Sequence, residues 1–184
     1  MTLWSRQISP NNSGPRWSPI VGVIIHSTRG GALTPELEYQ AAIDWFLNPT
    51  SEVSAHRIIA VDGDGVICVD DEDIAWHSGN YNQGWLGVEL VQQTIDTPFT
   101  IGQYETLANL LREWSTMYSF PLDKVHVRGH DEVDQRKSDP GPQFNWPYLW
   151  DLLKEEEKMN KEALTDALHE VWAVREALRK AAAV

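Results

Sequence analysis

Apolar and polar positions along the first 130 residues predict short strands, separated by loops and two helices. Residues 21–25 form a nearly continuous apolar run, mostly of β-branched side chains, which is typical of a buried strand. This strand is predicted to end at His26, where a polar loop containing glycines begins. A histidine therefore stands at the C-terminal edge of a buried strand.

A helix is predicted after this loop, from Thr34 to about Leu47. Thr34 is a suitable N-cap and Pro35 occupies the first helical position. Acidic Glu36 and Glu38 follow in the first turn, where negative charge favours the helix dipole. An Asn-Pro step then ends the helix.

Two further apolar segments predict a hairpin and a buried strand. Residues 57–61 and 66–69 flank two Asp-Gly steps, which readily adopt the backbone angles of a tight connection. Residues 85–91 predict another strand, and it contains one charged residue, Glu89. A carboxylate in such a run requires a partner or a function, because burying an unpaired charge is costly.

The strongest helical periodicity before residue 130 lies in residues 101–118, whose apolar positions recur every three or four residues. Residues 123–129 then predict a strand, and His130 follows its end. This order of elements predicts an α/β fold, in which helices flank a mixed central β-sheet. His26 and His130 would both stand where a strand gives way to a loop, a common location of functional residues.

The C-terminal part of the chain predicts a short helix over residues 144–153 and then a long helical tail. Residues 154–184 are rich in Ala, Glu, Lys and Leu and contain no Gly or Pro. Apolar residues form a seam of fewer than three heptads: Leu164, Ala167, Val171, Val174, Leu178 and Ala181. The tail either packs on its own domain or forms a short coiled coil that joins copies into a homo-oligomer. We expect a catalytic domain over 1–153 and a tail over 154–184.

Composition narrows the classes of protein. A length of 184 residues allows one domain with an appendage, and a net charge of −12 disfavours nonspecific binding to nucleic acid. The single cysteine, Cys68, excludes an internal disulfide and a four-thiolate zinc site, and its place in a predicted strand favours a buried thiol. Residues 1–20 lack the apolar segment of a secretion signal, and no stretch is long enough to span a membrane. We therefore expect cytoplasmic synthesis without a signal peptide.

Ionisable residues crowd the segment 130–142, which ends in a proline-rich turn. Catalytic zinc takes three protein ligands from His and carboxylate groups and keeps a fourth position open. His26, His130 and one nearby carboxylate satisfy that number.

Among the aromatic residues, Trp45 and Trp114 fall on predicted helices and are interpreted as core.

Five short motifs occur in a fixed order along the chain: Val23-Ile24-Ile25-His26-Ser27, Ser54-Ala55-His56, Ala75-Trp76-His77-Ser78-Gly79, Leu86-Gly87-Val88-Glu89-Leu90, and Gly129-His130 through Arg136-Lys137-Ser138-Asp139-Pro140-Gly141-Pro142. In this order they resemble the type 2 N-acetylmuramoyl-L-alanine amidases. That family includes phage endolysins, a cytosolic muropeptide-recycling amidase and the peptidoglycan-recognition proteins. The resemblance covers about residues 18–150.

The resemblance implies one zinc ion (Zn2+) held by His26, His130 and Asp139. The loop between His130 and Asp139 contains eight residues, one fewer than is usual in the recycling branch. Three other carboxylates therefore remain alternative ligands: Asp131, Glu132 and Asp134.

The resemblance also implies roles for residues around the metal. Glu89 matches an acidic residue that can accept a proton from water and pass it to the leaving amine. Lys137 matches the family's catalytic lysine and offers a cation for the oxyanion. Trp76, His77 and Trp85 are predicted to contact substrate.

The implied function is zinc-dependent hydrolysis of the amide bond between N-acetylmuramic acid and L-alanine of peptidoglycan. The altered loop and the added tail favour a phage or prophage endolysin, which would act on the cell wall after release from the cytoplasm. The alternative is a cytosolic amidase that recycles anhydro-muropeptides. A peptidoglycan-binding protein without activity is a third interpretation. The partner is peptidoglycan or a muropeptide in each case.

Overall fold

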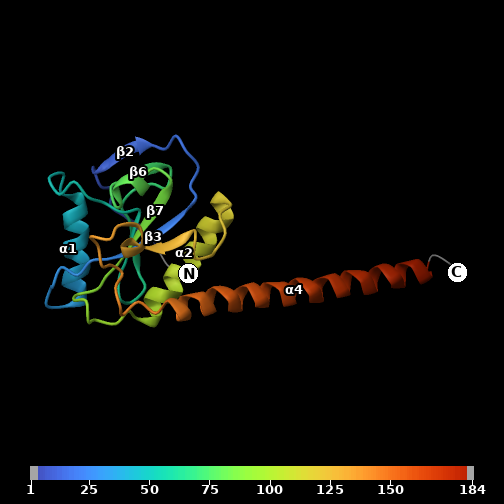
Figure 1. Cartoon of the computed structure of the whole chain (residues 1–184). Helices are drawn as coiled ribbons and strands as arrows, with labels where there is room; N and C mark the ends of the chain where they lie inside the picture. The colour runs from blue at the N-terminus through green and yellow to red at the C-terminus, as the bar shows by residue number, and fades with distance from the viewer. Residues whose placement is uncertain (1–3, 182–184) are drawn as a thin grey trace. The chain divides into compact units, whose positions relative to one another are not determined.

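The computed structural model describes residues 4–181, with side chains described for residues 4–155 and 164–172. The chain divides into a compact unit that ends at Asn145 and a second unit that begins at Trp146. Figure 1 labels helices and strands of both units. The domain boundary expected at 153/154 falls within the second unit. Among the described residues, every helix is too short or too polar to cross a membrane.

The compact unit is built on a six-stranded mixed sheet. Its spatial order is β1 (Trp4–Arg6), β5 (Gly65–Ile67), β4 (Arg57–Ile59), β7 (Trp85–Leu90), β3 (Gly22–Ser27) and β8 (Val127–Gly129). Strands β4 and β5 pair antiparallel as the predicted hairpin, whereas the other neighbours are parallel. Two short strands, β2 (Asn12–Pro15) and β6 (Asp73–Ala75), lie side by side as a separate antiparallel pair (Figure 1). The predicted fold class is confirmed.

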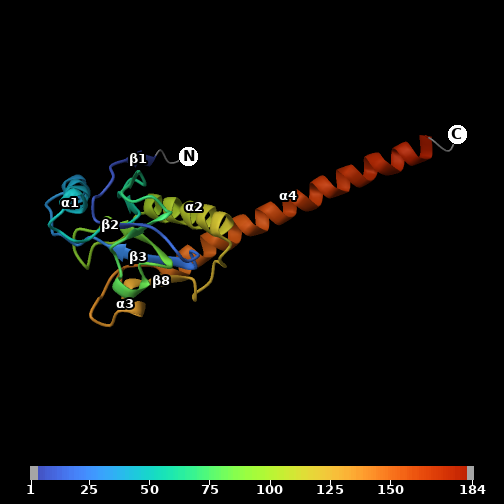
Figure 2. The same cartoon turned by 90° about the horizontal axis from the view of Figure 1, so that it is seen from above.

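Strand β3 lies between β7 and β8 and is buried along its whole length, and β3 and β8 appear next to each other in Figure 2. In the parallel register His26 is opposite Glu89, and Ile25 is opposite Gly129, the residue before His130. Parallel strands end at the same edge of a sheet, which is where ligands bind in open α/β folds. The sheet therefore brings His26, Glu89 and His130 to one edge.

Helix α1 (Pro35–Leu47) begins as predicted, because the Thr34 side chain accepts a hydrogen bond from the Leu37 N–H. Its buried residues Ile43 and Phe46 pack into a cluster with side chains of the sheet and the following loops: Ala55, Ile58, Val66, Cys68 and Val91. This cluster fixes α1 against the hairpin β4–β5.

Helix α2 (Ile101–Tyr118) has the predicted bounds. Thr100 and Gln103 form a reciprocal capping box at its start, and Ser119 ends it with a left-handed backbone (φ 59°). Its buried stripe includes Tyr104, Leu107, Leu111 and Trp114. Trp114 is 1% exposed, which confirms its interpretation as a core residue.

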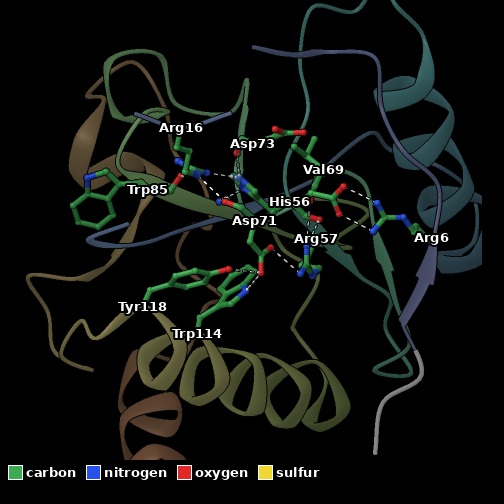
Figure 3. Close-up of polar contacts among 12 residues, drawn as sticks. Arg6, Arg16, His56, Arg57, Val69, Asp71, Asp73, Trp85, Trp114 and Tyr118 are labelled. Atoms are coloured by element: carbon green, nitrogen blue, oxygen red, sulfur yellow. Dashed lines mark hydrogen bonds and ion pairs between the residues drawn. The ribbon is translucent and has the colours of Figure 1, made fainter. Parts of the chain in front are cut away.

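Asp71 is the centre of a largely buried polar network that connects the hairpin to α2 (Figure 3). One carboxylate oxygen lies 2.7 Å from Arg57 Nη2, and the other accepts hydrogen bonds from Trp114 Nε1 at 2.7 Å and Tyr118 OH at 3.3 Å. Arg57 also donates to two backbone carbonyls. The charges are therefore paired and hydrogen-bonded, as buried charges must be, and they tie the hairpin to α2.

Strand β8 is shorter than the predicted strand over 123–129 and begins at Val127. The Asp123 carboxylate accepts hydrogen bonds from the N–H groups of Val125 and His126, so the chain turns there before it enters the sheet. The structure also contains elements that the sequence did not predict. Each has three or four residues, too few to produce a periodic signal: β1, β2, β6, the 3-10 helix η1 (Gly79–Tyr81) and α3 (His130–Val133).

The second unit is helix α4 (Trp146–Ala181), a single helix of 36 residues. The sequence predicted a separate short helix before residue 154, but the residues around that point include no Gly or Pro that would stop a helix. In the predicted heptad seam, Leu164 and Val171 are 62% and 66% exposed. Three seam residues have side chains outside the described part: Val174, Leu178 and Ala181.

Candidate metal centre

Three side-chain atoms from distant parts of the chain converge at the C-terminal edge of β3. His26 Nδ1 lies 3.0 Å from His130 Nδ1 and 3.2 Å from Asp139 Oδ2, and His130 Nδ1 lies 3.0 Å from the same oxygen. Both histidines are almost fully buried. Among the residues with described side chains, these three form a group that could hold a metal ion.

The shortened loop still delivers Asp139 to the histidines. The Asp131 N–H donates to the Asp139 carbonyl at 2.9 Å, which closes the loop across its base. The alternative carboxylates have other partners, because Glu132 accepts the N–H of Gly129 and Asp134 pairs with its neighbour Arg136. The structure thus brings Asp139, and not Asp131, Glu132 or Asp134, into the cluster with His26 and His130.

The donor set fits a zinc ion. Two imidazole nitrogens and one carboxylate oxygen are the ligands that zinc takes in catalytic sites. Burial lowers the pKa of His26, which favours the neutral ring that binds a metal. Although burial opposes ionisation of Asp139, the adjacent His130 and His26 side chains hold its pKa below the usual range. Three electron-pair donors therefore face one another at a point where a cation would satisfy them all.

Glu89 lies beside this cluster, on β7 opposite His26. Its side chain lines the same cavity of about 330 Å³ as the three candidate ligands. Burial and the negative charge of Asp139 raise the pKa of Glu89 well above its ordinary value. A carboxylate with a raised pKa next to a candidate metal site is suited to proton transfer.

Two cations border Asp139. Lys137 is exposed and lines the cavity with the candidate ligands. Arg29 was not predicted; its Nη2 lies 3.7 Å from Asp139 Oδ1, and its Nη1 donates to Ser138 Oγ at 3.1 Å. Arg29 could be found only with the fold in hand, because it is 110 residues before Asp139 in the sequence.

Comparison with known proteins identifies the family. A family model described as N-acetylmuramoyl-L-alanine amidase matches residues 16–142, which is more than half of the chain. This chain belongs to the N-acetylmuramoyl-L-alanine amidase family. The match includes every candidate ligand, Glu89 and Lys137.

Individual relatives agree with this assignment. The 1,6-anhydro-N-acetylmuramyl-L-alanine amidase AmpD of Salmonella typhimurium is 38% identical over 104 residues, which are 52% of this chain and 54% of that protein. The match therefore spans about half the length of that relative. N-acetylmuramoyl-L-alanine amidase A of Achromobacter lyticus is 26% identical over 172 residues, 82% of this chain and 92% of the relative. A crystal structure of a selenomethionine derivative of AmpD superposes with a TM-score of 0.66 at 27% identity, covering 83% of this chain and 96% of that one.

The cavity of this amidase-family chain has aromatic walls. Trp45 from α1 and Trp76 both line it, and Trp76 Nε1 donates to Ser13 Oγ at 2.7 Å. Trp45 is 54% exposed, so its interpretation as a core residue is wrong. The helical spacing of α1 does not distinguish the face toward the sheet from the face toward the cavity.

Two further cavities adjoin the candidate metal centre of this amidase-family chain. One of about 360 Å³ is mainly apolar, is lined by Ala41, Ala42 and Trp45 of α1, and shares Glu89 with the central cavity. The other, of about 540 Å³, is lined by Trp76 and His77 among others. A long substrate could therefore extend to both sides of the candidate ligands.

The remaining predicted substrate contacts lie in different environments. His77 lines two of the cavities, yet both of its ring nitrogens have partners inside the protein. Trp85 does not line the three cavities described here; its ring packs edge-on against Tyr81 at 5.8 Å.

Proposed function

We propose that this chain is a zinc-dependent amidase that cleaves the amide bond between N-acetylmuramic acid and L-alanine, and that its substrates are soluble 1,6-anhydro-muropeptides. The observation that carries the proposal is the convergence of His26, His130 and Asp139 on a cavity that also contains Glu89. The name of the 38% identical relative specifies the anhydro form of the sugar. This supports the recycling alternative over the endolysin interpretation that the sequence alone favoured.

The residues present supply the chemistry of amide hydrolysis. Zinc held by His26, His130 and Asp139 would polarise the amide carbonyl and make water acidic enough to ionise near neutral pH. The Glu89 carboxylate takes a proton from the attacking water and returns it to the nitrogen of L-alanine as the C–N bond breaks. The Lys137 ammonium stabilises the negative charge that develops on the carbonyl oxygen. The products are a free carboxyl group on the sugar moiety and a free amine on the peptide.

The cavity walls suggest how the substrate is held. Trp45 and Trp76 offer aromatic surfaces on which a sugar ring or an apolar side chain can pack. The adjoining cavities on either side would receive the sugar and the stem peptide. His77 lines the central cavity and one adjoining cavity, whereas a contact from Trp85 stays a prediction.

An amidase assay tests this function. Purified protein is incubated with an anhydro-muropeptide and, separately, with intact sacculi, and newly released L-alanine amino groups are measured. We expect release from the soluble substrate that is abolished by a chelator and restored by zinc, with little release from sacculi. Equal rates on the two substrates would favour wall lysis instead, and the absence of zinc-dependent release from both would refute the enzyme assignment.

We further propose that α4 joins two copies of the chain. Its described part exposes four large apolar side chains, Leu164, Leu168, Val171 and Trp172. Leu164 and Val171 lie one heptad apart in the predicted seam, as do apolar residues that face the partner helix in a coiled coil. Deletion of residues 154–184 should lower the mass measured by light scattering without loss of amidase activity. An unchanged mass would refute association through this helix.

A further inference from the structure

The donors and acceptors behind His26 determine which of its nitrogens is available to a metal. His77 Nε2 lies 3.2 Å from the backbone carbonyl oxygen of Trp85. A carbonyl oxygen only accepts hydrogen bonds, so this nitrogen of His77 carries a hydrogen. The two ring nitrogens of His77 face a backbone carbonyl and a second imidazole, neither of which is an anion, so the ring is neutral and carries a single N–H.

The remaining nitrogen of His77 must then be an acceptor. His77 Nδ1 lies 3.0 Å from His26 Nε2, and it has an electron pair because the hydrogen of the neutral ring is on Nε2. His26 Nε2 is therefore the donor of this bond and carries the N–H of its own ring. The electron pair of His26 is left on Nδ1, the atom that faces His130 and Asp139.

The surroundings hold this chain of hydrogen bonds in place. The Trp85 carbonyl also accepts from Arg16 Nη2 at 3.3 Å, as Figure 3 shows, and it belongs to β7, next to β3. The His77 ring lies directly over Gly87, where a Cβ atom would stand 2.6 Å from His77 Cγ. A side chain on residue 87 would displace the ring, so the glycine makes room for it. The Asn82 side chain accepts the backbone N–H groups of His77 and Ser78, which fixes the loop that carries the ring.

We propose that His77 is a positioning residue that transmits the orientation of the Trp85 carbonyl to His26 and keeps the Nδ1 electron pair of His26 directed at the metal. The proposal rests on the proposed metal site. It assigns His77 a role other than substrate contact. Partners that orient a ligating histidine typically contribute 10- to 100-fold in metal affinity.

Two substitutions at residue 77 separate positioning from packing. His77→Phe keeps a ring of similar size but has no acceptor, so we expect zinc affinity to fall by about 10- to 100-fold. His77→Asn can place its amide oxygen near the position of Nδ1, and we expect most of the affinity to return. Zinc affinity is measured by competition with a chromophoric chelator. His126→Phe, at a histidine whose ring pairs with nearby Asp123, is the matched control and should leave affinity unchanged.

The proton position supplies a second readout that needs no metal. In metal-free protein labelled with ¹⁵N-histidine, imidazole NMR shifts should report the N–H of His26 on Nε2 in the native chain. This preference should be lost in His77→Phe and retained in His77→Asn. Gly87→Ala should weaken zinc binding in the same direction as His77→Phe, because it displaces the ring.

The outcomes distinguish the positioning role of His77 from the metal site on which it rests. Zinc binding by His77→Phe as tight as that of the native chain, with the His26 proton still on Nε2, would overturn the positioning role. If the native chain bound no zinc, the metal site itself would fail, while the NMR measurement would still decide whether His77 fixes the proton of His26.

Discussion

Glu38 provides a sharp test of how the loop next to the candidate metal centre is held. Its side chain is 2% exposed, and its carboxylate accepts the backbone N–H of Gly30 at 2.5 Å and of Ala32 at 2.9 Å. The same loop carries Arg29, whose guanidinium lies near Asp139. Glu38 thus connects helix α1 to the loop that borders the candidate ligands.

The expected cost of Glu38→Gln follows from these two bonds. A hydrogen bond to a charged group contributes about 1.5–3 kcal/mol, and a buried donor left without a partner costs about 1–3 kcal/mol. Glutamine retains one acceptor oxygen but turns an NH₂ group toward the second N–H. We therefore expect a loss of about 2–4 kcal/mol, a large part of the roughly 5–15 kcal/mol by which domains are stable.

Urea unfolding monitored by tryptophan fluorescence measures this loss, provided that the m-value stays constant so that the midpoint reports stability. Glu36→Gln is the matched control, because Glu36 lies in the same helical turn but is exposed; it should change the free energy of unfolding by less than about 0.5 kcal/mol. A Glu38→Gln variant as stable as this control would refute the structural role of the carboxylate.

Three other predictions concern single side chains. Asp139→Ala should abolish stoichiometric zinc in metal analysis, whereas Asp131→Ala should retain it; the reverse would reassign the third ligand. Glu89→Gln should keep the metal but lower turnover by about 10²–10⁴-fold, as expected for loss of a proton-transfer group; turnover near the native rate would exclude that role. Burial raises the pKa of Cys68 to about 12, so at pH 8.5, where roughly half of an ordinary thiol is ionised, Cys68 should resist alkylation until the chain is unfolded. Rapid alkylation of folded protein would contradict its burial.

The sequence predicted the elements whose hydrophobic pattern is long enough to define a period. Helix α2 and the buried strands β3 and β7 were found from their apolar patterns, and α1 was found from its cap and end signals. Those strands also indicated His26 and Glu89, because a polar residue at or near the end of an apolar run requires an explanation. The match between pattern and structure was poorest for the short strands β1, β2 and β6, which derive their stability from neighbours and not from their own sequence.

Contacts between distant residues could not be derived in this way. Asp139 was selected by resemblance, and only the folded loop distinguishes it from the other carboxylates of the segment. Glu38 was interpreted as an acid of the first helical turn, yet it binds the loop before that helix. Trp45 has the helical spacing of a core residue. Its exposure depends on whether the sheet extends beneath that part of α1, which the sequence pattern does not show.

The strand order of the sheet has a consequence for folding. His26 and His130 are 104 residues apart, and they meet only after β3 has paired with β7 and β8. Contacts of such long sequence separation form late, because closing a long loop is entropically unfavourable. We expect α1 and α2 to gain structure before the candidate ligands assemble, so a newly synthesised chain would bind the proposed metal in one of the last steps. Uptake of the ion would then mark completion of the sheet.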